Sequence, residues 1–287
     1  MASGKTNFKP LKTLTMKILN HLLYGNDDKQ VNYRPTPNKG GKYIPRYLIM
    51  HYTAATTEES AISWLVSPIA QASAHLIIGR EGTITQLAPF NIVNWHAGKS
   101  TWAGLIGMNQ YSIGIEMINA GRLSKIGEKY ICPVDKREVN KDDVLLATHK
   151  NETHEALWQE YPEAQIEVLQ EIASLLVKTY NLIDILGHED ISPIRKSDPG
   201  PAFPMKSFRA RAMGRKNEDL DTYIATTILN IRSGPGTTFE LLAKPLPEGT
   251  KVTTLKTEGN WSFVQVEDIV NGLMDLEGWV FTKYLGK

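Results

Sequence analysis

The sequence predicts an α/β layered domain followed by a small all-β barrel. Short apolar runs with strand character, at residues 47–51 and 112–118, are interspersed with helical stretches such as residues 162–180. Strands and helices mixed in this way indicate a layered α/β domain. After a charge-dense stretch at residues 206–222, residues 223–287 carry short strand-like segments separated by turns, which is typical of a small β-barrel.

The first 45 residues predict one helix and one loop. Apolar residues at positions 11, 14, 18 and 22 share one helical face, which indicates a short helix packed on the body of the protein. A helix lying on a membrane surface is the alternative. Polar residues interrupt the apolar run at 14–23 and no small-x-small cleavage site follows, so we expect no signal peptide. Residues 26–45 are rich in Asn, Lys, Gly and Pro and predict a loop.

Between residues 47 and 142 strand and helix signals follow one another. In chain order they are a buried strand at 47–51, a helix at 56–66, a hairpin of strands 74–78 and 83–87, and a strand at 112–118. Alternation in the last strand points Ile113, Ile115 and Met117 to one side and Glu116 to the other. Residues 119–142 are polar and predict irregular structure.

The next elements are a long helix and a strand. Pro162 suits the first turn of a helix, and six apolar residues between positions 166 and 180 form a helical stripe. The strand at 183–186 ends at Gly187-His188. The predicted organisation is an N-terminal extension (1–39), a layered domain (40–214), a linker (215–222) and the barrel (223–287), with barrel strands expected at 229–236, 251–255, 261–266 and 278–281.

Composition excludes several classes of protein. A formal net charge of +1 gives no electrostatic argument for binding nucleic acid. Without an uninterrupted run of about 18 apolar residues, no integral membrane segment is expected. Cys132 is the single cysteine, so it cannot form an intrachain disulfide, and we interpret it as incidental.

The segment 187–200 carries the residue types of a zinc site. His188, Lys196 and Asp198 lie within eleven positions, and His51 ends the first strand. Two imidazoles and a carboxylate, with a fourth position left to water, suit a hydrolytic zinc site, whereas a closed structural site normally uses four protein ligands. His51 and His188 can bind the same ion only if the strands that carry them are neighbours. The alternative is that His51 simply caps a sheet.

Other polar residues could complete such a site. Glu116 sits inside a strand, so it either faces water or is held at a functional site, where it could take a proton from an attacking water. Lys196 could stabilise an oxyanion, or it could be a surface lysine. The residues His75, Trp95 and His96 are candidates for the wall of a cleft. The residues His149 and His154 are expected to face solvent from a helical segment, with His149 left open as a stray metal ligand.

Five segments together carry a family resemblance. They read L-I-M-H-Y-T-A at 48–54, A-H-L-I-I-G-R-E-G-T-I at 74–84, W-H-A-G at 95–98, S-I-G-I-E-M-I-N at 112–119 and G-H-E-D-I-S-P-I-R-K-S-D-P-G-P-A-F at 187–203. Over residues 40–214 the chain resembles the type 2 N-acetylmuramoyl-L-alanine amidases, the group of the bacterial AmpD and AmiD enzymes. Peptidoglycan recognition proteins share that fold.

The resemblance implies a mixed central β-sheet flanked by helices, with zinc in a surface groove. His51, His188 and Asp198 match the metal ligands of the family, Glu116 its catalytic acid/base and Lys196 the residue that stabilises the transition state. The implied activity is zinc-dependent cleavage of the amide between N-acetylmuramic acid and the L-alanine of the stem peptide. A peptidoglycan-binding module without turnover and a zinc endopeptidase cutting within the stem peptide remain the alternatives.

The tail resembles a bacterial SH3-like domain. The resemblance rests on L-N-I-R-S-G-P-G-T-T at 229–238, G-N-W-S-F-V at 259–264 and E-G-W-V at 277–280, with an unusually long insertion at 267–276. It implies a module that binds cell-wall peptide or glycan; one that only packs on the first domain is the alternative. The expected partners are peptidoglycan or muropeptides, met outside the cytoplasm in the periplasm or after secretion. The oligomeric state is open, with a monomer as the default.

Overall fold

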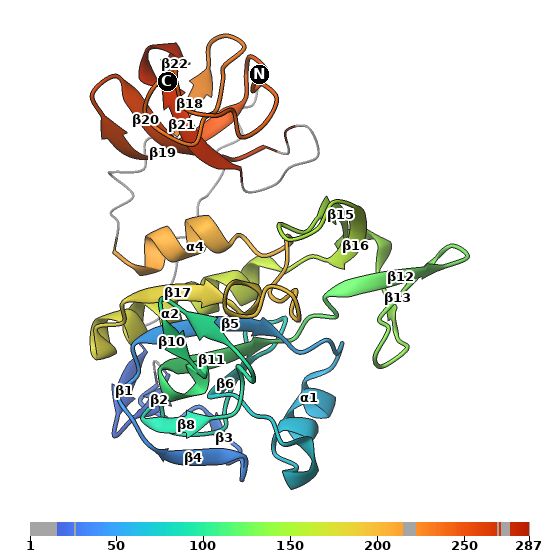
Figure 1. Ribbon diagram of the computed structural model, residues 1–287. Helices are drawn as coiled ribbons and strands as arrows, with labels where there is room; N and C mark the ends of the chain where they lie inside the picture. The colour runs from blue at the N-terminus through green and yellow to red at the C-terminus, as the bar shows by residue number, and fades with distance from the viewer. Residues whose placement is uncertain (1–15, 26, 215–221, 269, 271–275, 287) are drawn as a thin grey trace, which may run out of the picture.

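The computed structural model describes residues 16–25, 27–214, 222–268, 270 and 276–286 (Figure 1). Its centre is a six-stranded sheet with the order β17-β5-β11-β6-β7-β3. The strands are β3 (Asn32–Tyr33), β5 (Tyr47–Tyr52), β6 (Leu76–Ile78), β7 (Ile84–Gln86), β11 (Ser112–Met117) and β17 (Asp184–Gly187). All neighbouring pairs are parallel except β6 and β7, so the sheet is mixed, as the family resemblance implies.

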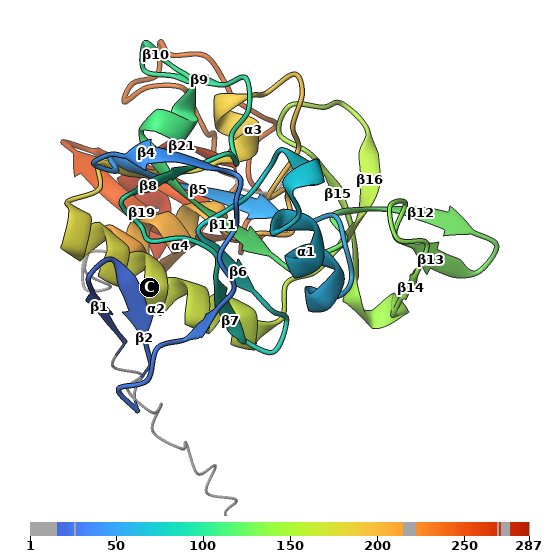
Figure 2. The ribbon, with the colours of Figure 1, turned by 90° about the horizontal axis from the view of Figure 1, so that it is seen from below.

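Helices cover both faces of this sheet because its strands alternate apolar side chains (Figure 2). One face packs against α2 (Glu163–Tyr180), where Leu48, Met50 and Ile115 join the buried stripe of the helix. The other face meets α1 (Glu58–Leu65) through Ile77 and Ile118. The predicted helices at 56–66 and 162–180, the 74–87 hairpin and the strands that end near His51 and His188 are therefore confirmed.

A second antiparallel sheet lies beside the central one, with the order β14-β13-β12-β16-β15. Its strands are β12 (Arg122–Ile126), β13 (Lys129–Ile131), β14 (Glu138–Val139), β15 (Val144–Thr148) and β16 (Glu155–Gln159). The predictions of irregular structure at 119–142 and of a helical segment around His149 are wrong. The strands β12 and β13 project from the body (Figure 1), so most of their side chains meet solvent and no apolar alternation marks them.

The N-terminal part of the described chain is also strand rather than helix. A hairpin joins β1 (Lys17–Leu19) to β2 (Leu22–Tyr24), while positions 11 and 14 of the predicted helix lie outside the described residues. Asn20 and His21 both have positive φ, 49° and 64°, which suits a two-residue hairpin turn. The side chain of Gln86 then accepts from the Leu23 amide and donates to the His21 carbonyl, which fixes the hairpin on the central sheet.

Short elements complete this part of the molecule. In the predicted loop at 26–45, β4 (Lys39–Lys42) pairs with β8 (Ile92–Asn94). A small hairpin joins β9 (Thr101–Trp102) to β10 (Leu105–Ile106), and the short helix α3 (His188–Ile191) directly follows β17. None of the helices in the described part of the chain has the length and hydropathy to cross a bilayer.

The C-terminal residues form a five-stranded antiparallel sheet with the order β21-β20-β19-β18-β22. The strands are β18 (Thr222–Ala225), β19 (Lys251–Glu258), β20 (Trp261–Val266), β21 (Glu277–Phe281) and β22 (Leu285–Gly286). Residues 229–236, predicted as a strand and turn, contribute only isolated bridges at Leu229 and Arg232. Figure 1 shows α4 (Met205–Ala212) between this sheet and the central one. Of the predicted linker, residues 215–221 lie outside the described residues.

Candidate metal centre

The parallel register of three strands assembles the site at one edge of the central sheet. His51 on β5 is the register partner of Glu116 on β11, so both side chains lie on the same face. On the other side of β5, Gly187 pairs with Met50, which brings the next residue, His188, beside His51. The condition that the two histidine-bearing strands are neighbours is met. Polar side chains thus gather beyond the carboxyl ends of parallel strands, where open α/β sheets bind ligands.

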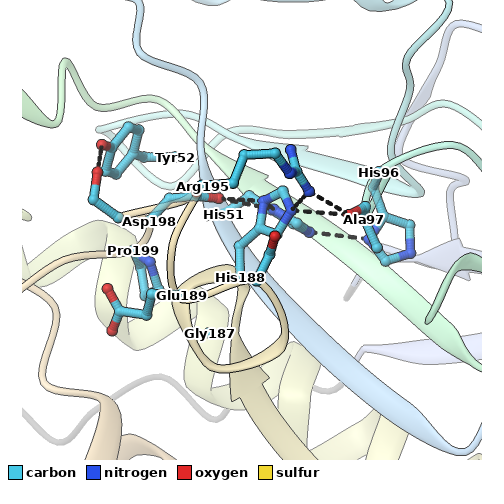
Figure 3. A network of polar contacts seen from close by, with 12 residues as sticks. His51, Tyr52, His96, Ala97, Gly187, His188, Glu189, Arg195, Asp198 and Pro199 are labelled. Atoms are coloured by element: carbon cyan, nitrogen blue, oxygen red, sulfur yellow. Dashed lines mark hydrogen bonds and ion pairs between the residues drawn. The ribbon is translucent and has the colours of Figure 1, made fainter. Parts of the chain in front are cut away.

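Three potential ligand atoms converge at this edge (Figure 3). The distances between His51 Nδ1, His188 Nδ1 and Asp198 Oδ2 are 2.9 Å for every pair. All three residues are buried, and they form one group able to hold a metal ion. The sequence-predicted ligand set is therefore brought together in the structure.

The hydrogen bonds of His188 determine which of its nitrogens carries a proton. Its Nε2 lies 3.1 Å from the carbonyl oxygen of Ala97. A carbonyl oxygen can only accept, so Nε2 donates. Arg195 Nη2 lies 3.4 Å from the same nitrogen, but its protons have nearer acceptors at 3.0 Å in the carbonyl oxygens of Ala97 and Lys99. In a neutral imidazole the remaining nitrogen is then an acceptor, so His188 Nδ1 presents a lone pair to the site.

The tautomer of His51 depends on a third histidine, His96. His96 Nε2 lies 3.1 Å from the Ser112 carbonyl oxygen and donates to it, which leaves His96 Nδ1 as an acceptor. His51 Nε2 lies 3.0 Å from that acceptor and donates in turn. Burial is the main cause that lowers the pKa of His51 to about 4 and that of His96 well below its usual value, so both rings are neutral near pH 7. His51 Nδ1 therefore also presents a lone pair.

Three acceptors so close together repel one another unless a proton or a metal cation lies between them. The lowered pKa values of His51 and Asp198 disfavour a proton on either of these two groups near neutral pH. Zinc bonds of about 2.0–2.2 Å to nitrogen and oxygen place tetrahedral ligand atoms roughly 3.3 Å apart, close to the spacing here. The residues thus fit a zinc ion with three protein ligands and a fourth, open position.

Glu116 stands beside this group. Its Oε2 atom is buried and has no hydrogen-bond partner among the described residues. Burial raises the pKa of Glu116 well above its usual value, the Asp198 carboxylate adds to the rise, and Lys196 opposes it. A carboxyl group with a raised pKa can exchange a proton near neutral pH.

The site opens into a groove of about 420 Å³. Its lining comes from the strand ends, α1 and the loop before Asp198, and consists of Tyr52, Thr53, Ala54, Ala61, Trp64, Leu65, Ala72, Ser73, Trp95, His96, Glu116, His188, Arg195, Lys196, Ser197 and Asp198. Trp95 and Lys196 therefore lie where a substrate could meet them. His75 does not line the groove. It is fully buried, its Nδ1 accepts from the Gly114 amide, and its Nε2 lies 2.9 Å from the Ile92 carbonyl oxygen.

Two of the groove residues that were not predicted from the sequence, Arg195 and Trp64, have side chains suited to a functional role. Arg195 Nη2 donates to the carbonyl oxygens of Ala97 and Lys99, at 3.0 Å each, and lies 3.4 Å from His188 Nε2. Trp64 on α1 exposes about half of its surface at the rim. No local pattern marks Arg195, because its partners lie more than ninety positions earlier in the chain. An exposed tryptophan at the solvent side of a predicted helix could have identified Trp64.

The expectation that His149 faces solvent is wrong. His154 is exposed as expected, but it lies in a bend rather than in a helical segment. His149 is almost fully buried, and its Nε2 lies 2.6 Å from Glu189 Oε2. Lys150 adds an ion pair of 2.8 Å to the same carboxylate, so His149 belongs to a buried charged cluster behind the zinc-ligand loop.

Comparison with known proteins agrees with this geometry. The family described as N-acetylmuramoyl-L-alanine amidase matches residues 40–201. The chain is 28% identical over 210 residues to the N-acetylmuramoyl-L-alanine amidase AmiD of Escherichia coli K12, covering 69% of this chain and 65% of AmiD. It is 32% identical over 140 residues to the 1,6-anhydro-N-acetylmuramyl-L-alanine amidase AmpD of Salmonella typhimurium LT2, covering 48% of this chain and 56% of AmpD. The chain thus spans slightly under two thirds of AmiD and about half of AmpD.

Solved structures of the same proteins are also similar. One is the complex of AmiD from E. coli with the substrate anhydro-N-acetylmuramic acid-L-Ala-D-gamma-Glu-L-Lys, at 26% identity and a TM-score of 0.45, covering 67% of this chain and 64% of that one. Another is a selenomethionine derivative of AmpD, at 25% identity and a TM-score of 0.46, covering 63% and 93%. Because the family match extends over more than half of the chain and includes His51, Glu116, His188 and Asp198, the chain belongs to the N-acetylmuramoyl-L-alanine amidase family.

Proposed function

We propose that this protein is a zinc-dependent N-acetylmuramoyl-L-alanine amidase. It hydrolyses the amide between the lactyl group of N-acetylmuramic acid and the L-alanine of the stem peptide. The observation that carries the proposal is the group of three closely spaced ligand atoms beside Glu116, at the floor of an open groove. Membership of the amidase family supports the choice of bond.

In this proposal His51, His188 and Asp198 hold the zinc ion. Bound zinc supplies Lewis acidity and lowers the pKa of a bound water towards about 7. The three ligands come from adjacent strand ends and the following loop. With only three protein ligands, a bound zinc ion would keep a position for water, and the groove beside the ligands would admit the scissile carbonyl.

In this proposal Glu116 transfers a proton, and Lys196 stabilises the negative charge on the carbonyl oxygen. Glu116 takes the proton of the attacking water and returns it to the nitrogen of the leaving L-alanine, a role that its raised pKa suits. The Lys196 side chain, which makes no hydrogen bond or ion pair that we observe with the described residues, lies at the wall of the groove. Its ammonium group stabilises the negative charge that develops on the carbonyl oxygen.

The substrate class follows from the relatives and the shape of the groove. The complex of AmiD contains a muropeptide, and AmpD is named for anhydro-muropeptides. The open groove here, with Trp95 in its wall and Trp64 at its rim, can receive a sugar on an aromatic face. We assign both tryptophans as substrate contacts.

The C-terminal sheet is proposed as an SH3-like wall-binding domain over residues 223–287. The rings of Trp261, Phe281 and Tyr284 form a continuous cluster, with centroid distances of 5.4 and 5.8 Å, and Tyr284 is exposed. Exposed aromatic clusters provide contact area for glycan or peptide. A wall-binding module favours polymeric peptidoglycan over soluble fragments as the substrate, and the cell wall outside the cytoplasm as the place of action.

The test is a product analysis by mass spectrometry. Purified protein is incubated with peptidoglycan and with an anhydro-muropeptide, with zinc, with a chelator, and with zinc restored. We expect intact stem peptides with a free L-alanine amino group, lost on chelation and recovered with zinc. Shortened stem peptides would identify an endopeptidase, and co-sedimentation with the wall without any product would identify a binding module.

A further inference from the structure

We infer that His96 and Asn109 are positioning residues that set the tautomers of both imidazole ligands through one short segment, residues 96–97. The inference rests on the proposed zinc site but goes beyond it. One residue of the segment orients His51 through its side chain, and the next orients His188 through its carbonyl oxygen. A single support therefore controls two of the three ligands.

The first half of this support is the ring of His96. It lies between His51 Nε2, at 3.0 Å, and the Ser112 carbonyl oxygen, at 3.1 Å, so it accepts from one and donates to the other. The ring is buried against β11, at a point where a Cβ atom on Gly114 would collide with it. Only glycine leaves room for the ring here, so backbone and ring fit together in one arrangement.

The second half is the carbonyl oxygen of Ala97. It accepts from His188 Nε2 at 3.1 Å and from Arg195 Nη2 at 3.0 Å. Arg195 also donates to the carbonyl oxygen of Lys99, so the guanidinium group is hydrogen-bonded to the backbone on both sides of Gly98. Figure 3 shows His51, His96, Ala97, His188 and Arg195 meeting in one network.

Asn109 fixes the segment that carries both contacts. Its side-chain oxygen accepts from the backbone amides of His96, at 3.0 Å, and Ala97, at 2.7 Å. Both hydrogen bonds that we observe for this side chain go to the segment rather than to a ligand, and they hold the backbone that carries the His96 ring and the Ala97 carbonyl.

The consequence concerns the affinity for zinc. Without the acceptor of His96, the proton of His51 can move to Nδ1, and that nitrogen then has no lone pair for the metal. Partners that fix the ring and tautomer of a metal-ligating histidine typically contribute about 10- to 100-fold in metal affinity or activity.

The test compares four variants of the full chain by zinc affinity, measured in competition with a chelating indicator. His96→Leu removes the acceptor. His96→Asn restores an acceptor, because the amide oxygen can take the place of Nδ1. Asn109→Ala removes both amide contacts, and Asn109→Asp keeps them. Thermal unfolding of each metal-free variant is measured alongside.

A matched control is available in His75→Leu. His75 is another buried histidine, 6.0 Å from His96 between ring centroids, but its nitrogens bond to the backbone rather than to a ligand. This variant loses stability for the same structural reasons as His96→Leu. A general loosening of the fold would therefore lower the zinc affinity of both variants.

We expect His96→Leu and Asn109→Ala to lose about 10- to 100-fold in zinc affinity. We expect His96→Asn and Asn109→Asp to recover most of it, and His75→Leu to retain the wild-type value despite a lower Tm. Equal affinities for wild type and His96→Leu, or an equal loss in His75→Leu, would overturn the inference. A wild-type protein that binds zinc without cleaving muropeptides would count against the proposed function only, because the affinities test the positioning residues independently of turnover.

Discussion

Two buried contacts between histidine and carboxylate lie on either side of the same loop, and they differ in where the proton sits. In the metal centre, His51 and His188 donate their protons away from Asp198, so lone pairs face the carboxylate. Behind the loop, His149 Nδ1 accepts from the Asn151 amide, so the proton on Nε2 points at Glu189. The first arrangement requires a cation, whereas the second is already satisfied.

The comparison shows that residue types and burial do not by themselves identify a metal site. Both clusters contain histidine and carboxylate side chains that are nearly inaccessible to solvent. What separates them is the partner of the other ring nitrogen, which is an acceptor at the metal centre and a donor at His149. A cluster of histidine and carboxylate side chains is therefore a metal-site candidate only where the second ring nitrogen of each histidine has a hydrogen-bond acceptor as its partner.

The largest expected effect comes from breaking the metal centre itself. Asp198→Ala removes one of three ligands, so we expect loss of zinc and a fall in kcat/KM of roughly a thousand-fold or more. Zinc content by elemental analysis and muropeptide turnover provide the measurements. His154→Ala, a change at an exposed histidine, is the control that should retain both. Full metal occupancy in Asp198→Ala would remove this residue from the ligand set.

The next effect separates metal binding from proton transfer. Glu116→Gln keeps the shape of the side chain but cannot exchange a proton, so we expect zinc to stay bound while kcat falls about 10²- to 10⁴-fold. Turnover at saturating muropeptide and zinc content measure the two properties separately. A rate close to that of the wild type would show that Glu116 is not the acid/base.

A loss of stability is expected when the buried contact between His149 and Glu189 is broken. His149→Leu removes the proton donor of Glu189 and leaves the carboxylate with Lys150 as its remaining charged partner. A buried acceptor that loses its hydrogen-bond donor typically costs about 1–3 kcal/mol, more when it is charged, so we expect about 3 kcal/mol for the Glu189 carboxylate. Urea unfolding measures the loss, and zinc affinity of the folded variant should stay at the wild-type value. If His149→Leu instead lost zinc and kept its stability, His149 would be part of the metal centre rather than of a separate structural cluster.

The smallest effect concerns a third histidine environment, that of His75. Burial lowers the pKa of His75 from 6.5 to about 3, so in acid the unfolded chain binds a proton that the folded chain excludes. Stability is complete above pH 6.5 and falls as the pH drops towards 3, by about 2–3 kcal/mol from this residue at pH 4.5. Urea unfolding of the metal-free protein at pH 7 and 4.5 measures this loss. The control His75→Leu should lose less between the two values; an equal loss would assign the pH dependence to other groups.

Much of the site could be predicted from the sequence because its residues occur at strand ends and in one compact motif. His51, His188 and Asp198 were recognised from their residue types, and the parallel pairing of β5 with β17 brings them together. The sequence carries no comparable signal for the roles of His96 and His149. Their tautomers depend on a carbonyl oxygen and an amide whose positions only the folded backbone determines.

The fold was predicted best where an element is buried on a regular period. The strands β5 and β11 and the helix α2 carry such apolar patterns, whereas the projecting strands β12 and β13 are mostly solvated and give none. The N-terminal hairpin was mistaken for a helix because its apolar spacing fits both. The chain forms a hairpin because Asn20 and His21 both adopt the positive φ that a two-residue turn requires.

The register between β5 and β11 has a consequence for how the site can change. His51 and Glu116 are opposite one another on a backbone hydrogen-bond ladder, so their spacing is set by the ladder rather than by the packing of their side chains. Conservative replacement of core residues leaves that spacing intact. Insertion or deletion of a single residue within either strand moves one of the two side chains to the opposite face. The site should therefore tolerate conservative substitutions in the core beneath it but not a one-residue insertion or deletion within either strand.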